Sequence, residues 1–233
     1  MTESTVRRVG MLAPMQPELQ PIVRRLGMEG DGSLYRGRAG DIEVVAMLTT
    51  IGMAAGAQAA ARILELGVDW VMVVGIAGGV DRSVPIGEVV VPEVVIDRAT
   101  GGRFRPSHVG SIAARGTLSC GDELITGQDE LNSMAARGVV AVDMETAAVA
   151  AVCVGAACPW SVFRGISDYA GEGLVDDALF AMTRPDGTAD PDVIARYLEE
   201  NPDRKQVLVR LAHDTKLATE AAAAAAIDAC SAL

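Results

Sequence analysis

The stretch that decides the fold is VVAVDMET, residues 139–146. Its first half is short and apolar, which predicts a buried strand, and the Ala- and Val-rich residues 147–157 behind it predict a helix. Asp143 and Glu145 fall where the strand meets the helix. Asp143 could be the N-cap, because carboxylates at a helix start gain about 0.3–1 kcal/mol each from the helix dipole. Glu145, in the first turn, could instead bind a ligand hydroxyl group in the crevice where an α/β sheet opens.

Other predicted strands also lead into chemically distinctive residues. Residues 6–13 predict a first strand, and a helix that starts at Pro17 places Glu18 just beyond the end of that strand. Residues 69–74 form the apolar run typical of a buried parallel strand, and the glycine cluster GIAGG follows at 75–79. The cluster is either a tight turn or a place where the backbone approaches a ligand closely. It matches neither the dinucleotide-binding fingerprint nor the P-loop.

The pattern recurs after the helix. Residues 160–163 predict another buried strand, and Arg164 and Asp168 follow it. Ligands bind in open α/β sheets at the carboxyl ends of the strands. We therefore expect Glu18, Glu145, Arg164 and Asp168 to lie close together.

The C-terminal part of the chain is predicted to be helical. Asp190 can cap a short helix, and a last helix follows residues 201–202. Val207, Leu208 and Leu211 share one face of the last helix with several alanines, which predicts packing against the sheet.

Composition limits the function. At 233 residues and 50% hydrophobic content, a single domain over residues 1–233 is expected. The net charge of -11 argues against a nucleic-acid partner. Gly155 and Pro159 interrupt the longest uncharged run, so no membrane span is expected, and without a signal peptide we expect a cytoplasmic protein. The four cysteines and two histidines lack the spacing of a metal site.

Seven stretches match a known pattern in order, between about residues 7 and 170. They are APMQPE (13–18), TIGM (50–53), GIAGG (75–79), GEVV (87–90), GDELI (121–125), VDME (142–145) and RGISD (164–168). Through them the chain resembles the nucleoside phosphorylase/nucleosidase superfamily, and is most similar to its 5′-methylthioadenosine/S-adenosylhomocysteine nucleosidases.

The resemblance implies a three-layer α/β/α sandwich around a mixed, partly barrel-like sheet. It implies a homodimer that cleaves the N-glycosidic bond of a purine nucleoside without a cofactor. Asp168 would protonate the purine at N7, Glu145 with Met144 would hold the ribose hydroxyls, and Glu18, helped by Arg164, would act as base toward the attacking water. The other predicted substrate-binding residues are Gly78, Leu124, Ile125, Met15, Ile51 and Ser167.

The chemistry suits these roles. Cleavage through an oxocarbenium-like transition state needs an acid at the leaving group and a base across the sugar. We predict that burial keeps Asp168 protonated and that Glu18, beside Arg164, stays ionised. The structural alternatives are a helix-start acid for Glu18 and a structural Arg164–Asp168 pair.

The sequence also departs from the family. Ile76 stands where these nucleosidases commonly have a small hydroxyl residue or Val. Leu124 replaces a usual Phe, whose aromatic contact is worth about 0.5–1.5 kcal/mol beyond its buried area. Residues 98–113 and 184–205 do not match the family versions, so the base and the 5′ substituent stay unassigned.

Three functions are compatible with these residues. The first is hydrolysis of a purine nucleoside with an apolar or thioether 5′ group. The second is phosphorolysis, which needs cationic donors, whereas the first loop carries Glu18 and Met53 follows Gly52. The third is a binding module without turnover, which the joint presence of Glu18, Glu145 and Asp168 disfavours.

Overall fold

The computed structural model describes residues 6–80, 82–172, 182–184 and 186–233. The strands are β1 (Arg8–Ala13), β2 (Glu29–Gly30), β3 (Leu34–Ala39), β4 (Ile42–Leu48), β5 (Trp70–Gly79), β6 (Val89–Val90), β7 (Val94–Asp97), β8 (Arg103–Phe104), β9 (Thr117–Cys120), β10 (Val139–Asp143) and β11 (Trp160–Tyr169). The helices are α1 (Gln16–Leu26), α2 (Met53–Glu65), α3 (Gln128–Ala136), α4 (Thr146–Gly155), α6 (Pro191–Glu200) and α7 (Lys205–Cys230), with a 3₁₀ turn at Pro202–Arg204.

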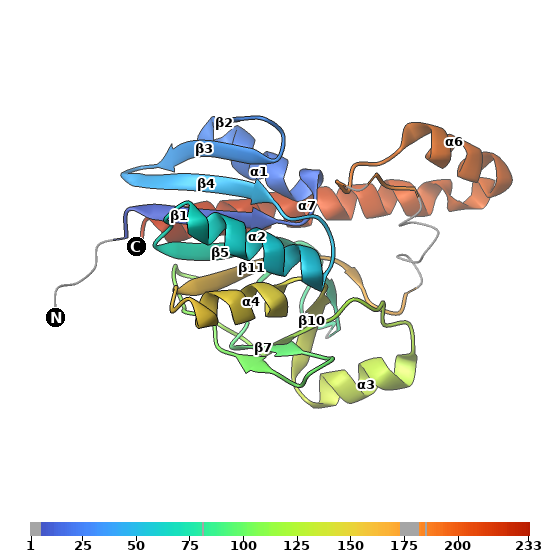
Figure 1. Ribbon diagram of the computed structural model, residues 1–233. Helices are drawn as coiled ribbons and strands as arrows, with labels where there is room; N and C mark the ends of the chain where they lie inside the picture. Colours follow the sequence, from blue (N-terminus) through green and yellow to red (C-terminus); the bar gives the residue numbers. More distant parts are fainter. Residues whose placement is uncertain (1–5, 81, 173–181, 185) are drawn as a thin grey trace.

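The strands form one mixed sheet (Figure 1). Its order is β2-β3-β4-β1-β5-β10-β9-β7-β8, and β11 pairs with β5 and β6 off this path. The pairing does not close on itself within the described ranges, so the sheet is open. The predicted α/β class with a mixed central sheet is confirmed.

The central strands feed two separate cores, one on each face of the sheet. Leu12 and Val73 point toward α2 and α4, whereas their neighbours Met11 and Val74 point toward α1 and α7. Successive side chains of a strand face opposite ways, so a strand covered on both faces is apolar at every position. The apolar runs of the sequence therefore correspond to the middle layer of a three-layer fold (Figure 1).

β5 and β11 are longer than the sequence predicts. They pair in parallel from Val71 and Trp160 to Gly79 and Tyr169. The tight-turn interpretation of residues 75–79 is therefore wrong, and so is the placement of Arg164 beyond a strand end. Glycine is disfavoured in strands. Here, however, β11 pairs with residues 75–79 and β10 pairs with Gly78 and Gly79, so backbone hydrogen bonds hold this segment extended.

The last helix packs on the sheet over only half its length. Its buried residues run from Ala218 to Cys230, and Val209 is 63% exposed. The predicted packing of Val207, Leu208 and Leu211 against the sheet is wrong. A helix of 26 residues is about 39 Å long, and its first half extends past the sheet beside α6 (Figure 1). We call residues 191–217 the arm.

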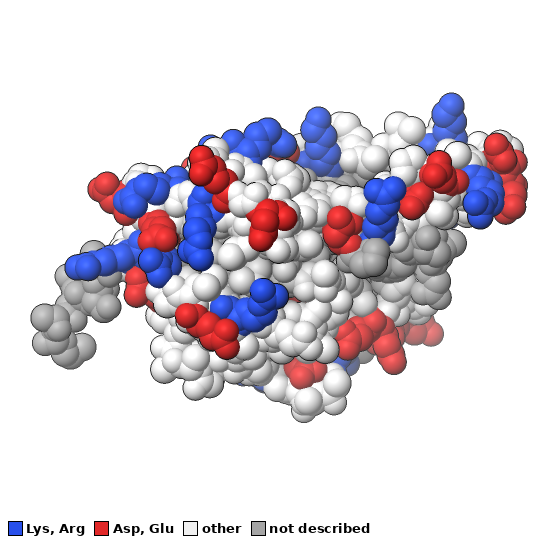
Figure 2. All heavy atoms as spheres, turned by 45° about the horizontal axis from the view of Figure 1, so that its top comes forward, with Lys and Arg blue, Asp and Glu red and all other residues white. Residues whose placement is uncertain are grey.

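Acidic and basic side chains are interspersed on the face that Figure 2 shows. Within the described ranges, no helix has both the length and the apolar character that a membrane crossing requires.

The contact between α7 and β11 depends on a glycine. A Cβ atom at Gly165 would overlap the backbone carbonyl of Ala218. We predict that Gly165→Ala lowers the free energy of unfolding by about 1–3 kcal/mol, the usual effect of overpacking. Urea denaturation measures this. Gly155→Ala is the control, because a Cβ there meets nothing within 4 Å, and it should leave stability unchanged or raise it by about 0.4–1 kcal/mol. Equal stabilities would contradict the close packing of α7.

Candidate functional site

A cavity of about 1010 Å³ lies at the ends of β1, β5, β10 and β11. Its walls are mostly apolar, and ten of the eleven predicted site residues line it. These are Glu18, Asp168, Glu145, Met144, Ile125, Leu124, Gly78, Met15, Ile51 and Ser167. Arg164 is the exception, because its side chain is fully buried beneath the cavity.

Three carboxylates surround the Arg164 guanidinium. Asp143 Oδ2 lies 2.6 Å from Nη2 and accepts a 2.9 Å hydrogen bond from Nε. Glu145 Oε2 lies 3.1 Å from Nη2, and Glu18 Oε1 lies 3.7 Å from Nη1. The side chains of all four residues are at most 6% exposed. The predicted structural pair between Arg164 and Asp168 is therefore wrong, since Arg164 pairs with three other carboxylates.

Backbone groups fix Glu18. Its Oε2 accepts the Met15 N–H at 2.7 Å, and its Oε1 accepts the Ile76 N–H at 2.7 Å. A Cβ atom at Gly75 would overlap Oε1 and lie 2.7 Å from Arg164 Nη1. The glycine cluster is thus a place of close approach, although at Gly75 the group that approaches is the side chain of Glu18 rather than a ligand. Ile76 contributes its backbone N–H, which any residue but proline could supply.

Glu145 links two helices. It is the N-cap residue of α4, not a first-turn residue as predicted, and its Oε1 accepts the N–H of Gly52, the N-cap residue of α2, at 3.0 Å. Asp143 ends β10 and is not the N-cap, but its Oδ1 accepts the Thr146 N–H at 3.4 Å. The Thr146 hydroxyl donates to Asp143 Oδ2. At the start of α4, Asp143 and Glu145 are thus both placed to interact with the helix dipole, while Glu145 also lines the cavity.

Burial dominates the electrostatics of this cluster. It raises the pKa of Glu18 to about 8 and that of Glu145 to about 7, against the lowering effect of Arg164. Burial alone would lower the pKa of Arg164, but the three carboxylates together raise it above its usual value, so the guanidinium stays charged. The prediction that Glu18 is ionised is therefore wrong at neutral pH, where its carboxyl group mostly holds a proton. One cation cannot compensate three buried anions, and protons take up the excess negative charge.

Asp168 also lines the cavity, from the end of β11. The pairing of β11 with β5 slips between Ile166 and Asp168, which is the register shift of a β-bulge at Ser167. The Ser167 hydroxyl donates to Asp168 Oδ1 at 2.6 Å, while Oδ2 lies on the side of Gly78. Burial raises the pKa of Asp168, partly offset by the Ser167 hydrogen bond. A proton held on Oδ2 would thus face the cavity.

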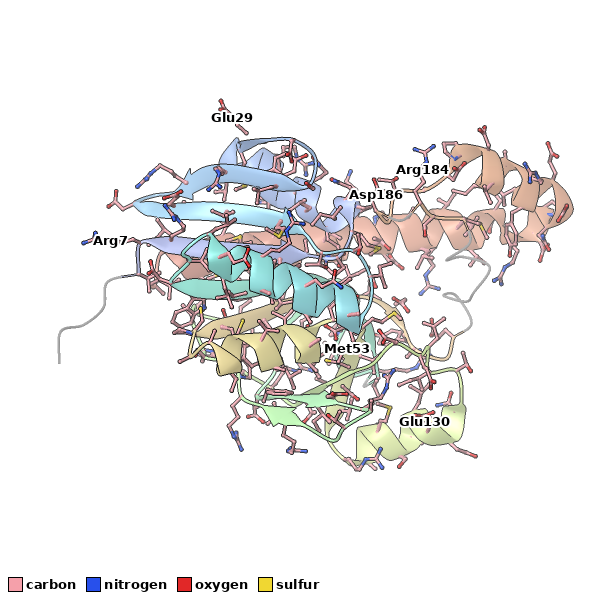
Figure 3. All side chains as sticks on the ribbon, in the orientation of Figure 1. Arg7, Glu29, Met53, Glu130, Arg184 and Asp186 are labelled. Atoms are coloured by element: carbon pink, nitrogen blue, oxygen red, sulfur yellow. The ribbon has the colours of Figure 1, made fainter. Side chains whose placement is uncertain are left out.

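The cavity is also lined by segments for which the sequence predicts no place in the site. Leu198, Leu208 and Leu211 of the arm line it, and Arg98 lines it from the unmatched residues 98–113. Asp186, which precedes the arm in the sequence, contacts the start of α1: the Gln16 N–H donates to the Asp186 carbonyl at 2.8 Å. Figure 3 shows Asp186 and Arg184 between the sheet and α6.

Sequence reasoning missed Asp143 as the nearest partner of Arg164, and missed Thr146. Both lie in the motif singled out first, but Asp143 was interpreted only as a cap. The sequence did contain a signal. A buried Arg requires an acidic partner, and Asp143 is the acidic residue at the end of the apolar run 139–142, which forms the buried strand β10.

Known proteins are similar to this chain in sequence and in fold. The family model of the phosphorylase superfamily matches residues 8–113 and 108–193. A relative from Colwellia psychrerythraea, named 5′-methylthioadenosine/S-adenosylhomocysteine nucleosidase, is 27% identical over 207 residues, which cover 71% of this chain and 85% of the relative.

Two solved structures share the fold. One is a nucleosidase of the same name from Helicobacter pylori with butyl-thio-DADMe-Immucillin-A, with a TM-score of 0.73, 18% identity and coverage of 99% of this chain and 100% of that one. The other is the futalosine hydrolase of Helicobacter pylori, with a TM-score of 0.72, 17% identity and coverage of 98% and 99%.

The buried cluster predicts a large effect of removing its cation. Arg164→Met leaves three buried carboxylates without a counter-ion, so we predict a loss of about 3–5 kcal/mol in the free energy of unfolding. Without the cation the carboxyl pKa values rise further, and a raised folded-state pKa means that stability is regained as the pH falls. Urea denaturation at about pH 8 and about pH 5 measures both effects.

Arg115→Met is the matched control. Arg115 pairs with Glu88 with both side chains at least 36% exposed, so its loss should cost less than about 1 kcal/mol at either pH. Similar losses in the two variants would contradict the structural role of the buried cluster.

Proposed function

The chain belongs to the phosphorylase superfamily, and from this we propose that it hydrolyses the N-glycosidic bond of a purine nucleoside with an apolar or thioether 5′ substituent. The products are the free base and the ribose derivative. The observation that carries the proposal is the placement of two buried carboxyl groups with raised pKa values, Asp168 and Glu18, on the wall of one cavity. Such a pair supplies the acid and the base of glycoside cleavage.

Asp168 is the proposed acid. The Ser167 hydroxyl occupies Oδ1, which leaves Oδ2 to carry the proton toward N7 of the purine. Protonation turns the departing base into a neutral leaving group. Leu124 and Ile125 line the same cavity and would contact the base.

Glu145 is the proposed ligand of the ribose hydroxyls. Its Oε1 and Oε2 each accept one hydrogen bond, from Gly52 and from Arg164, and each keeps a second lone pair for the sugar. As positive charge develops on the ribose, this carboxylate stabilises the transition state more than the bound substrate. Met144 beside it, with Met15 and Ile51, forms the apolar wall for the 5′ substituent.

Glu18 is the proposed base toward water. A base works best when its pKa lies near the working pH, and burial brings the pKa of Glu18 to about 8. Arg164 would assist by stabilising the ionised form of Glu18, which is the form that accepts a proton from water, since Nη1 lies 3.7 Å from Oε1.

The charge of the site favours water over phosphate as the nucleophile. A phosphate dianion near Glu18 would repel Glu18 in the ionised form that the reaction needs, and the Arg164 guanidinium is already paired with Asp143 and Glu145. A phosphorylase remains the second candidate and an inactive nucleoside-binding module the third. The similar proteins include a 5′-methylthioadenosine/S-adenosylhomocysteine nucleosidase and a futalosine hydrolase, which are named for different substrates. The preferred 5′ substituent is therefore to be measured with a panel of nucleosides. A cytoplasmic homodimer of single-domain subunits completes the proposal.

The acid role predicts the effect of Asp168→Asn. An amide cannot donate the proton that the leaving base requires, so base release should fall on the order of 10²–10⁴-fold in a folded protein. A purine nucleoside panel with detection of the free base measures this. The control is Asp129→Asn, an exposed change in the first turn of α3 that should keep full activity. Retention of more than about a tenth of the wild-type rate would remove Asp168 from the acid role.

The base role predicts the pH profile. The active form needs ionised Glu18 and protonated Asp168, so one limb of the kcat/KM profile should lie at about pH 8, the pKa of Glu18. Glu18→Gln should abolish this limb and lower kcat on the order of 10²–10⁴-fold while the nucleoside still binds. Glu88→Gln, a half-exposed change outside the cavity, should alter neither.

The same experiment separates water from phosphate. Wild-type activity in phosphate-free buffer should equal activity with added phosphate, and the sugar product should be the free reducing ribose derivative. Formation of a sugar 1-phosphate, or dependence on added phosphate, would refute hydrolysis and support the phosphorylase.

A further inference from the structure

Asp143 touches neither of the groups assigned to the acid and the base, yet it makes the closest contacts in the cluster. Its Oδ2 lies 2.6 Å from Arg164 Nη2 and 2.9 Å from Nε, compared with 3.1 Å for Glu145 and 3.7 Å for Glu18. The side chain is 2% exposed. One edge of the guanidinium is therefore seated on Asp143.

The seat itself is rigid. Asp143 is the last residue of β10, and Thr146, the first residue of α4, donates to its carboxylate through both the backbone N–H and the hydroxyl. The Thr146 hydroxyl oxygen also accepts from Arg164 Nη2 at 3.2 Å. Three elements of the fold thus meet at this carboxylate: β10, α4 and, through Arg164, β11.

The guanidinium is planar, so fixing one edge fixes the remaining amine. With Nε and Nη2 seated, Nη1 is directed to the side of Glu18, at 3.7 Å from Oε1. Nη1 is buried and has no hydrogen-bond partner within the described part of the chain. Glu18 does not hold the guanidinium by a hydrogen bond, because its Oε1 lies 3.7 Å from Nη1 and its two oxygens are fixed by backbone N–H groups.

We propose that Asp143 is a positioning residue of this site, which seats the Arg164 guanidinium so that its charge lies between Glu18 and Glu145 at fixed distances. The proposal rests on the hydrolase function for its kinetic part. Asp143 acts through Arg164 and is not in itself a catalytic residue.

The charges around Arg164 give the direction of the effect. Glu18 faces it from α1, Glu145 from the start of α4 and Asp143 from the end of β10, while the Cys120 thiol of β9 lies near Asp143. The charge of Asp143 raises the pKa of Glu145, and the charge of Arg164 lowers those of Glu18 and Glu145. Removing the Asp143 charge leaves Arg164 shared between two carboxylates instead of three, so both should bind their protons less tightly.

Asp143→Asn tests the proposal, because the amide keeps the shape and removes the charge. We expect kcat to fall about tenfold with KM little changed, which corresponds to about 1.4 kcal/mol of transition-state stabilisation. The limb of the pH profile near 8 should move to lower pH. A folded variant with the wild-type kcat and an unmoved limb would overturn the proposal and leave Asp143 with a purely structural role.

A second readout does not depend on the reaction. A seated guanidinium rotates slowly, so the Nε–H group of Arg164 should give a protected nitrogen-15 NMR signal in the wild type that is lost in Asp143→Asn. Arg164→Met identifies the signal. If the wild type released no base from any nucleoside but showed this loss, the proposed hydrolysis would fail and the seating would stand. If the signal persisted in Asp143→Asn, the seating itself would be refuted.

Thr146→Val decides the matter should Asp143→Asn not fold. It removes the hydroxyl that holds Asp143 Oδ2 and retains all four charges of the cluster. We expect a smaller loss of kcat, about threefold, a weaker Arg164 signal and an unmoved pH limb. An unchanged kcat together with an unchanged signal would overturn the proposal.

Discussion

Arg164 is buried completely, and the free-energy cost of taking its charge out of water is offset by acidic groups from three separate elements. This requirement organises the centre of the molecule. It brings the start of α1, the end of β10 and the start of α4 to one point on β11. It also requires a glycine at position 75, since any side chain there would displace Glu18. Removing Arg164 would leave three buried acidic groups without their cation.

The same cluster sets the chemistry available to the cavity above it. Because acids outnumber the cation, the site takes up protons at neutral pH rather than binding anions. Burial holds these protons on groups that can exchange them near physiological pH, namely Glu18 and Glu145. Burial also raises the pKa of Asp168, where the Ser167 hydrogen bond rather than Arg164 partly offsets it, and Asp168 lines the cavity beside the bulge at Ser167. Carboxyl groups of raised pKa therefore occur in two environments, Glu18 and Glu145 beside Arg164 and Asp168 beside Ser167.

Much of this arrangement could be predicted, because strand ends of one sheet converge and carboxylates at such ends are readable in a sequence. Glu18, Glu145 and Asp168 do line one cavity. The depth of burial could not be read, and burial is what protonates Glu18. The length of β5 was hidden by its glycines, because strand propensity says nothing about the neighbours that will pair with them. The packing of Leu208 and Leu211 was predicted wrongly because apolar residues have the same helical spacing whether that face of the helix covers a sheet or lines a cavity.

The last helix joins the outside of the molecule to its centre. α7 is one uninterrupted helix of 26 residues, held at one end by the sheet and free of the sheet at the other. Its carbonyl at Ala218 rests on Gly165, the neighbour of Arg164. The contact between α7 and β11 therefore lies one residue from Arg164, whose guanidinium is buried. Because no loop interrupts α7, a displacement of its first half would be carried along the helix to Ala218. The arm and the charge cluster are thus coupled through a single helix.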